Sequence, residues 1–300
     1  MHYAQLLFPD FSLIVCGFLV CRYSALNRKV WEQVDSLIYY FLFPVFLFHS
    51  IVRSPLDLSA ASSMILAAWL MVICSMLLSY AIAYLPGVDT HDHASAAQVA
   101  FRFNVYIALA LADRLAGREG LLLMAVIVGV CVPLCNMGAV WPMAKNTQQG
   151  FAKTLLRNPL VIATLAGLLA NVLGFSMPIL LDPTATRIGQ ACLALGLMAA
   201  GAGLQLGQVF NSASKRITGV LVLTLRHLLN PLIAFVLIHL FHLTGAQAIM
   251  LLVFSAMPTA SSCYVLAVKM GYNGAFAAGL VTLSTVLGLF SLPFALEFLR

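Results

Sequence analysis

Polar and helix-breaking residues interrupt an apolar stretch, residues 246–268, that is long enough to cross a bilayer. They are Ser255, Pro258, Thr259, Ser261, Ser262 and Tyr264. Pro258 cannot donate the hydrogen bond that the carbonyl of Phe254 would receive in a helix, and its ring crowds that carbonyl. Because hydrocarbon offers no water to a freed carbonyl, such a break lies inside protein or beside a wet cavity. The pattern predicts a broken helix that binds a polar solute, with a simple proline kink as the alternative.

A second polar group occurs in the apolar stretch 94–113. Gln98, Arg102 and Tyr106 share one face of a regular helix, whereas Asn104 would point to the opposite side. Unwinding near Asn104 would let Asn104 face inward together with the other three side chains, although no proline enforces a break there. An intramembrane arginine is costly and usually functional or paired. Arg102 is therefore expected to contact a substrate, with snorkelling to a headgroup or structural pairing as alternatives.

Together these residues favour an anionic ligand. The helices that restart after each break are expected to direct free N–H groups and positive dipole ends towards the site. With the Arg102 charge, this environment favours a carboxylate, and the two tyrosines would pack on the rest of a small organic anion. The predicted substrate-binding residues are Arg102, Asn104, Tyr106, Pro258, Thr259, Ser261, Ser262 and Tyr264.

Composition indicates a polytopic membrane protein. The 300 residues are 62% hydrophobic and 9% charged, whereas soluble domains are about 25% charged. The net charge of +6 is interpreted as loop charge that fixes topology, so no nucleic-acid partner is expected. The first apolar segment, 6–23, lacks a basic leader and a small-residue cleavage site, and we expect it to be retained. The seven cysteines lie almost entirely in apolar segments and predict neither disulfides nor a zinc site.

Ten segments approach the length of about 20 residues that crosses hydrocarbon. They are residues 6–23, 36–52, 59–84, 94–113, 120–141, 159–177, 185–207, 217–241, 246–268 and 275–298. Loops on one side carry nine lysines and arginines and those on the other side carry five. The richer side is predicted to be cytoplasmic, which places both termini on the non-cytoplasmic side.

Spacing indicates an internal repeat. The glycines before the fifth and tenth predicted spans match at an offset of 154 positions; they are Gly117, Gly120, Gly271 and Gly274. The same offset relates Asn104 to Pro258. We predict an all-α protein with a first inverted repeat in 1–145, a cytoplasmic linker in 146–157 and a second repeat in 158–300. Such repeats are typical of transporters that alternate access around a midplane site.

Other function classes are disfavoured. None of the ten carboxylates lies near the middle of a predicted span, which argues against a sodium–proton antiporter. Four histidines are interpreted as interface residues near span ends: His49, His227, His239 and His242. No nucleophile–base pair or set of metal ligands is recognised deep in a span, so no enzymatic activity, cofactor or metal is predicted. A receptor or scaffold would leave the polar spans unexplained.

Three smaller patterns have modest interpretations. His91-Asp92-His93 is assigned to an ordinary polar loop between the third and fourth spans. Asn136 and Asn171 are in-span amides that are expected to be buried against neighbouring helices or to line the cavity. A stripe of small residues permits close helix contact inside the fold or across a homodimer; it consists of Ala199, Gly203 and Gly207.

The motifs along the chain resemble one known family. They are Tyr40-Phe-Leu-Phe-Pro44, Phe101-Arg-Phe-Asn104, Asn158-Pro159 and Ser255-Ala-Met-Pro-Thr-Ala-Ser-Ser262. Together they resemble the auxin efflux carrier family, and in particular its bacterial, malonate-permease-like members. The resemblance implies ten helices in a five-plus-five inverted repeat, with spans four and nine crossing as broken helices in the bacterial cytoplasmic (inner) membrane. Plant members have a proline where this chain has Asn104, so auxin specificity is not carried over.

We therefore expect a secondary active or facilitative transporter of small organic anions (carboxylates) that works by alternating access. The alternative is a sodium-coupled symporter of the bile-acid-transporter type, in which unwound carbonyls and hydroxyls would hold sodium. Coupling to protons or to sodium is left open, because a substrate carboxylate or a histidine can also carry a proton.

Overall fold

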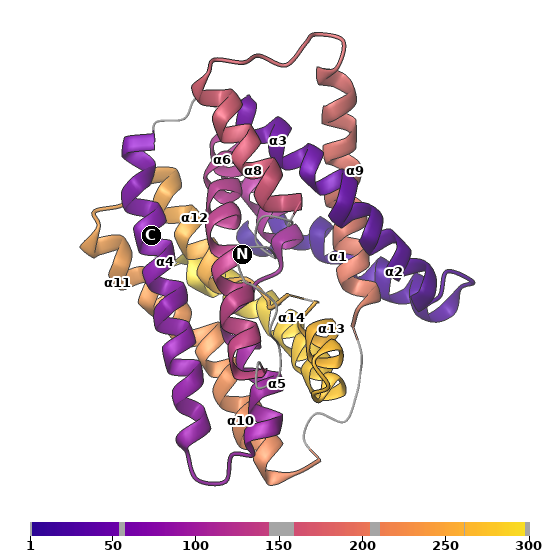
Figure 1. Cartoon of the computed structure of the whole chain (residues 1–300), viewed down its shortest axis with the longest axis vertical. Coiled ribbons are helices and arrows are strands. Elements are labelled where there is room, and N and C mark those ends of the chain that lie inside the picture. The colour runs from indigo at the N-terminus through magenta and orange to yellow at the C-terminus, as the bar shows by residue number, and fades with distance from the viewer. Residues whose placement is uncertain (1, 54–57, 144–158, 205–210, 261, 298–300) are drawn as a thin grey trace. The chain divides into compact units, whose positions relative to one another are not determined.

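Helices are the only regular structure in the part of the chain described here (Figure 1). The computed structural model describes residues 2–53, 58–143, 159–204, 211–260 and 262–297. Five helical segments are long and apolar enough to cross a membrane: Arg28–Val52, Ser62–Tyr84, Thr90–Met143, Ala213–Leu240 and Gly274–Glu297. The described residues are thus all-helical, with segments that suit a membrane protein, and the count of ten spans stays a prediction.

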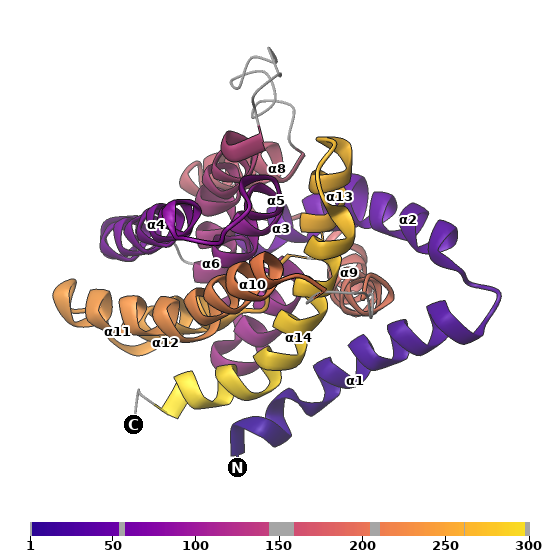
Figure 2. The same cartoon turned by 90° about the horizontal axis from the view of Figure 1, so that it is seen from below.

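The helices gather into two compact units. The first unit comprises Met1–Ile65, Tyr106–Pro133 and Gln149–Gly203. Its elements are α1 (His2–Tyr23), α2 (Arg28–Leu37), the π-helical turn η1 (Ile38–Leu42), α3 (Phe43–Val52), the middle of α6 (Val105–Val140), α8 (Pro159–Val172) and α9 (Asp182–Ala202). α9 packs against α1, α2 and α3, and α3 also packs against α8 (Figures 1 and 2).

Small residues permit the close approach of α1 and α9. A Cβ atom on Gly201 would overlap with the carbonyl oxygen of Ile14. Ala199 and Gly203 of the small-residue stripe are buried within the chain, and Gly207 lies outside the described residues. The described part of the stripe is therefore used inside the fold, and a homodimer stays a prediction.

The second unit contains both predicted breaks. It comprises Leu66–Val105, Leu134–Gln148 and Leu204–Arg300. Its elements are most of α4 (Leu58–Ala81), the 3₁₀ turn η2 (Ile82–Tyr84), α5 (Thr90–Phe101), the two ends of α6, the 3₁₀ turn η3 (Trp141–Met143), α10 (Ala213–Thr224), the π-helical turn η4 (Leu225–Leu229), α11 (Asn230–Leu240), α12 (Gly245–Ala256), α13 (Cys263–Lys269) and α14 (Gly274–Glu297). α5 packs against α10, α13 and α14, and α12 packs against α11 and α14 (Figure 2).

Each unit takes segments from both halves of the sequence. The units therefore do not coincide with the predicted repeats, 1–145 and 158–300, which remain a prediction about the sequence halves. The predicted linker, 146–157, lies outside the described residues.

Helical structure stops at the two places that the sequence indicates. α5 ends at Phe101, and Arg102 follows with extended backbone angles (φ −76°, ψ 147°) before α6 begins. α12 ends at Ala256, and Met257 is also extended (φ −58°, ψ 143°) before α13 begins. The structure thus shows the unwinding that was predicted near Asn104 and at Pro258.

Prolines account for two π-helical turns. Pro44 follows η1, and Pro231 follows η4, each within two residues of the turn. A proline has no N–H to donate and its ring crowds the preceding turn, which a wider turn accommodates. Single π-helical turns often occur at functional sites. The turn η4 carries Arg226 and His227 in the middle of the long apolar segment Ala213–Leu240.

Candidate functional site

The two breaks are hydrogen-bonded to each other. The backbone N–H of Asn104 donates to the carbonyl oxygen of Pro258 at 2.8 Å. The hydroxyl of Thr259 donates to the carbonyl oxygen of Arg102 at 3.1 Å. Backbone groups that a continuous helix would satisfy internally are therefore satisfied by the other broken helix, as buried polar groups require.

α14 supports the break in the second of these helices. The N–H of Thr259 donates to Ser284 Oγ at 3.0 Å, and the ring of Pro258 lies so close to Gly288 that a Cβ there would overlap with it. Ser284 Oγ also lies 2.8 Å from His227 Nε2. A glycine and a serine on one face of α14 thus fit the proline ring and the freed N–H that follows it.

The Arg102 side chain joins both sides of the crossing. Its Nη1 donates to Gln98 Oε1 at 2.9 Å, and its Nη2 donates to Ser262 Oγ at 3.0 Å and to Asn136 Oδ1 at 3.3 Å. Gln98 in turn donates to the carbonyl oxygen of Cys263 at 3.0 Å. These partners are all neutral, and no carboxylate among the described residues lies within 4.0 Å of the guanidinium. Its positive charge is therefore oriented but not neutralised.

Five of the predicted substrate-binding residues come together at this crossing: Arg102, Asn104, Pro258, Thr259 and Ser262. Arg102 is half-buried and Ser262 is exposed, so this edge of the crossing is accessible, whereas Asn104 and Thr259 are buried. Arg102 and Ser262 are consequently the described groups best placed to meet a solute.

The other three predicted residues have different outcomes. Tyr106 belongs to the first unit, where its ring lies 5.6 Å from that of Phe43 and against Gly196. Its ring is thus used in packing there, and a substrate contact stays a prediction. Tyr264 is half-buried on α13, and Ser261 lies outside the described residues.

The helix that restarts after the second break is short. α13 has seven residues, which is about two turns at 3.6 residues per turn, and a helix this short has a small macrodipole. Ser262 at its N-terminal end makes no capping hydrogen bond with its side chain, and its hydroxyl accepts from Arg102. At the second break the guanidinium of Arg102 therefore supplies more positive charge than the end of α13.

The sequence model of the family described as "Membrane transport protein", the auxin efflux carrier family domain, matches residues 141–296, which is more than half of the chain. The chain belongs to the auxin efflux carrier family. No curated protein matches it.

The family consists of membrane transporters. This agrees with the prediction that the protein is a transporter and not an enzyme. The match includes α12, α13 and α14, which form the second break and its support. The sodium-coupled bile-acid-type alternative receives no support.

This family member has an arginine at the crossing whose role the sequence did not reveal. The carbonyl of Phe254, which Pro258 was predicted to free, accepts from Arg226 Nη2 at 3.3 Å. Arg226 lies in the predicted span 217–241, four residues before Asn230. Its position inside an apolar segment was a usable signal, because intramembrane arginines are rarely without a role.

The interpretation of His227 as an interface residue near a span end is wrong. His227 lies in η4, in the middle of Ala213–Leu240, and is half-buried. Its Nδ1 lies 2.8 Å from Ser291 Oγ and its Nε2 lies 2.8 Å from Ser284 Oγ. The imidazole therefore links η4 to α14, the helix that supports the second break.

His49 is near the end of α3, as expected, but it is buried and paired. Its Nε2 lies 3.0 Å from Asp182 Oδ1, and Arg53 Nε lies 3.4 Å from the same oxygen. Asp182 precedes the predicted span 185–207. The hydrogen bond from His49, assisted by the charge of Arg53, holds the pKa of Asp182 below its usual value. This cluster belongs to the first unit.

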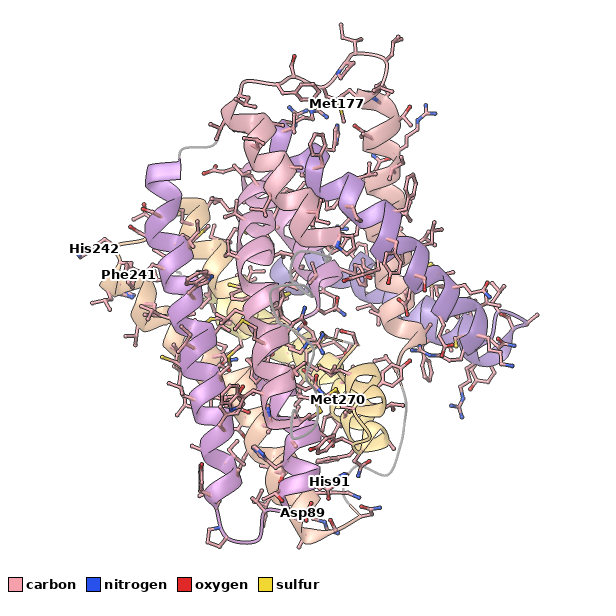
Figure 3. All side chains as sticks on the ribbon, in the orientation of Figure 1. Asp89, His91, Met177, Phe241, His242 and Met270 are labelled. Atoms are coloured by element: carbon pink, nitrogen blue, oxygen red, sulfur yellow. The ribbon has the colours of Figure 1, made fainter. Side chains whose placement is uncertain are left out.

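The segment His91-Asp92-His93 is the first turn of α5 and not a loop. Asp89 caps this helix by accepting from the N–H of Asp92 at 2.8 Å. Asp92 accepts from Asn273 at 2.8 Å, and His91 stacks on Tyr272. Figure 3 labels Asp89 and His91 at the same end of the second unit. Although Asp89, His91 and Asp92 present ligand atoms within 4.8 Å of one another, capping and side-chain contacts account for them.

Proposed function

We propose that this auxin efflux carrier family member transports small organic anions that carry a carboxylate, as a secondary active or facilitative transporter that alternates access. The observation that carries the proposal is the environment of Arg102. A guanidinium sits in an apolar span, at the point where two broken helices bind each other, and its described partners are neutral. An anionic ligand would supply the missing countercharge.

The chemistry of the side chains supports this choice. A buried or half-buried charge is expensive in hydrocarbon and is normally balanced by a partner. A guanidinium is planar and matches a carboxylate through paired, charge-assisted hydrogen bonds. Gln98 and Asn136 hold the Arg102 plane in place, so little conformational entropy is lost when the ligand binds.

The hydrogen bond between Asn104 and Pro258 favours the inverted repeat. These residues correspond at the offset of 154 positions, and they contact each other directly. Corresponding residues meet only where they lie close to the axis that relates two repeats. Ten spans, a site near the bilayer midplane, a location in the inner membrane and outward-facing termini are part of the proposal.

Uptake by proteoliposomes tests the proposed function. Purified full-length protein is reconstituted and supplied with labelled mono- and dicarboxylates, and in parallel with their neutral amides, with and without proton and sodium gradients. We expect saturable uptake of at least one acid and none of its amide, because only the acid provides a charge for Arg102. The gradient dependence then identifies the coupling ion, if one is used.

Two site variants accompany this assay. Asn104→Ala and Ser262→Ala are expected to lower the uptake rate, while Asn211→Ala, an exposed asparagine before α10, retains it. If both site variants transport as well as the wild type, the assignment of the site is wrong. Absence of uptake for every acid by folded, inserted protein would refute the assignment of the substrate class.

A further inference from the structure

Arg226 is the most deeply buried charge among the described residues. Its side chain is only 1% exposed and lies in η4, inside a segment long and apolar enough to span the membrane. Its Nε donates to the carbonyl oxygen of Met257 at 2.5 Å, its Nη2 to that of Phe254 at 3.3 Å, and its Nη1 to that of Ala100 at 3.4 Å. No carboxylate in the described ranges lies within 4.0 Å of it.

These three carbonyls all lie at the C-terminal ends of helices. Ala100 is in the last turn of α5, Phe254 is in the last turn of α12, and Met257 is the first residue beyond α12. The end of a helix leaves its last carbonyls without partners, and its macrodipole places about −0.5 of an elementary charge there. Two such ends supply about −1 in total, which matches the single positive charge of a guanidinium.

The side chain of Asn230 contacts one of these carbonyls. Asn230 Nδ2 donates to the carbonyl oxygen of Ala100 at 2.8 Å. The other atom of that amide, Asn230 Oδ1, is fully buried and has no hydrogen-bond partner within the described part of the chain. The guanidinium of Arg226 is thus surrounded by three carbonyl oxygens, a cluster suited to a positive charge, and the Asn230 amide holds one of them, that of Ala100, in place.

In transporters with broken helices, unwound carbonyls and the C-terminal ends of half-helices coordinate a coupling cation. We propose that Arg226 is a tethered cation: its guanidinium permanently occupies the cation position between the C-terminal ends of α5 and α12. The guanidinium then balances the negative C-terminal ends of α5 and α12 without a soluble cation. Transport therefore requires neither sodium nor potassium. The statement about transport rests on the proposed function, whereas the statement about the cation position does not.

Removal of the tether would leave an unoccupied cation site. In Arg226→Ala the three carbonyl oxygens lose this donor but stay in place around a volume the size of a guanidinium. A free guanidinium ion fits this volume and its hydrogen-bonding pattern, and it would stabilise the folded state by mass action. Urea has nearly the same shape as guanidinium but no charge. It therefore shows whether an added ligand stabilises the variant through its charge or only by filling the space.

Thermal unfolding of the purified full-length protein tests the cation position. Guanidinium is titrated up to about 20 mM, far below the molar range that unfolds proteins, against urea and sodium at equal concentrations. We expect Arg226→Ala to have a lowered Tm that guanidinium restores saturably towards the wild-type value and urea does not. Wild type and Arg187→Ala, in which an exposed arginine is removed, should show no such rise. If guanidinium raises the Tm of Arg226→Ala no more than it raises that of the wild type, Arg226 is not a tethered cation.

A second pair of variants covers the case in which Arg226→Ala does not fold. Arg226→Lys keeps a charge and Arg226→Met keeps much of the length without it. The proposal expects folded Arg226→Lys without additive and folded Arg226→Met only when guanidinium is present during purification. Equal yields of the two variants without additive would overturn it.

Uptake by wild-type proteoliposomes tests the consequence for transport. With sodium and potassium replaced by N-methylglucamine, the rate of carboxylate uptake should be unchanged, and a requirement for either ion would contradict the proposal. If no carboxylate is taken up at all, the proposed function fails, while the unfolding experiment still decides the role of Arg226.

Discussion

The backbone N–H of Asn104 donates to the carbonyl oxygen of Pro258 at 2.8 Å, which joins the two interrupted helices at their breaks. Neither residue can make this bond in a continuous helix, because the N–H and the carbonyl would then be used within their own segments. The geometry of each break therefore depends on the other, and a change at one should be felt at both.

Restoring a helix-compatible residue at the second break should impair transport. In Pro258→Ala, residue 258 regains an N–H that competes with Arg226 for the carbonyl of Phe254. It also loses a ring whose presence in a helix costs about 3 kcal/mol. We expect uptake to fall about tenfold or more, which corresponds to about 1.4 kcal/mol, with a Tm that is unchanged or higher.

A second proline provides the control for this variant. Pro293 lies inside helix α14, near its C-terminal end at Glu297 and away from the break, and Pro293→Ala should transport normally. Parallel measurements of uptake and Tm separate loss of the break from loss of the fold. Normal uptake by Pro258→Ala would show that the break is a tolerated kink.

Neutralising Arg102 from within the protein should displace the substrate. Asn136 Oδ1 accepts from Arg102 Nη2 at 3.3 Å, so Asn136→Asp places a carboxylate there without changing the size of the side chain. Since charged hydrogen bonds contribute about 1.5–3 kcal/mol, the apparent affinity for the anion should fall about tenfold or more. Asn136→Ala removes the acceptor but leaves the charge free, and its affinity should change far less. Similar affinities for the Asp and Ala variants would count against a charge-selective site.

The pairing of His49 with Asp182 should make part of the stability depend on pH. Asp182 has a folded-state pKa below its usual value, so the unfolded state takes up its proton first as the pH falls. Its contribution is complete above the unfolded pKa of about 3.9 and is lost as the pH falls through the lower, folded value. The Tm of Asp182→Asn should therefore lie below that of the wild type at neutral pH, and the two should converge below about pH 4. If the difference in Tm between the wild type and Asp182→Asn stays constant down to pH 3, the pairing of His49 with Asp182 is not the cause of that difference.

The breaks themselves could be predicted because their causes are local in the sequence. Pro258 removes a donor from its own helix, and the disagreement between the faces of Arg102 and Asn104 concerns neighbouring positions. Apolar length likewise indicated most of the helices, but it missed the polar helix α2, Arg28–Leu37. α8, with fourteen residues, ends before the predicted boundary at residue 177. Hydrophobicity alone does not fix the ends of helices, which depend on caps and turns such as the one at Gly174.

The partners of the freed groups could not be predicted, because they come from distant positions. Arg226 is 28 positions from Phe254, and His227 is 57 positions from Ser284. A sequence shows that a carbonyl lacks a donor but not which side chain the fold brings to it. The same reason explains Tyr106, whose spacing with Gln98 and Arg102 is regular, but whose ring packs against Phe43 beyond the break.

Equilibrium binding of a labelled carboxylate to purified protein tests the central claim most directly, since it depends on the site and not on the transport cycle. We expect saturable binding by the wild type and by Arg187→Gln, which removes an exposed charge of the same kind. Arg102→Gln, which removes the guanidinium at the crossing, should lose this binding. If Arg102→Gln binds the acid with wild-type affinity, the anion site does not depend on Arg102 and the proposed site is wrong.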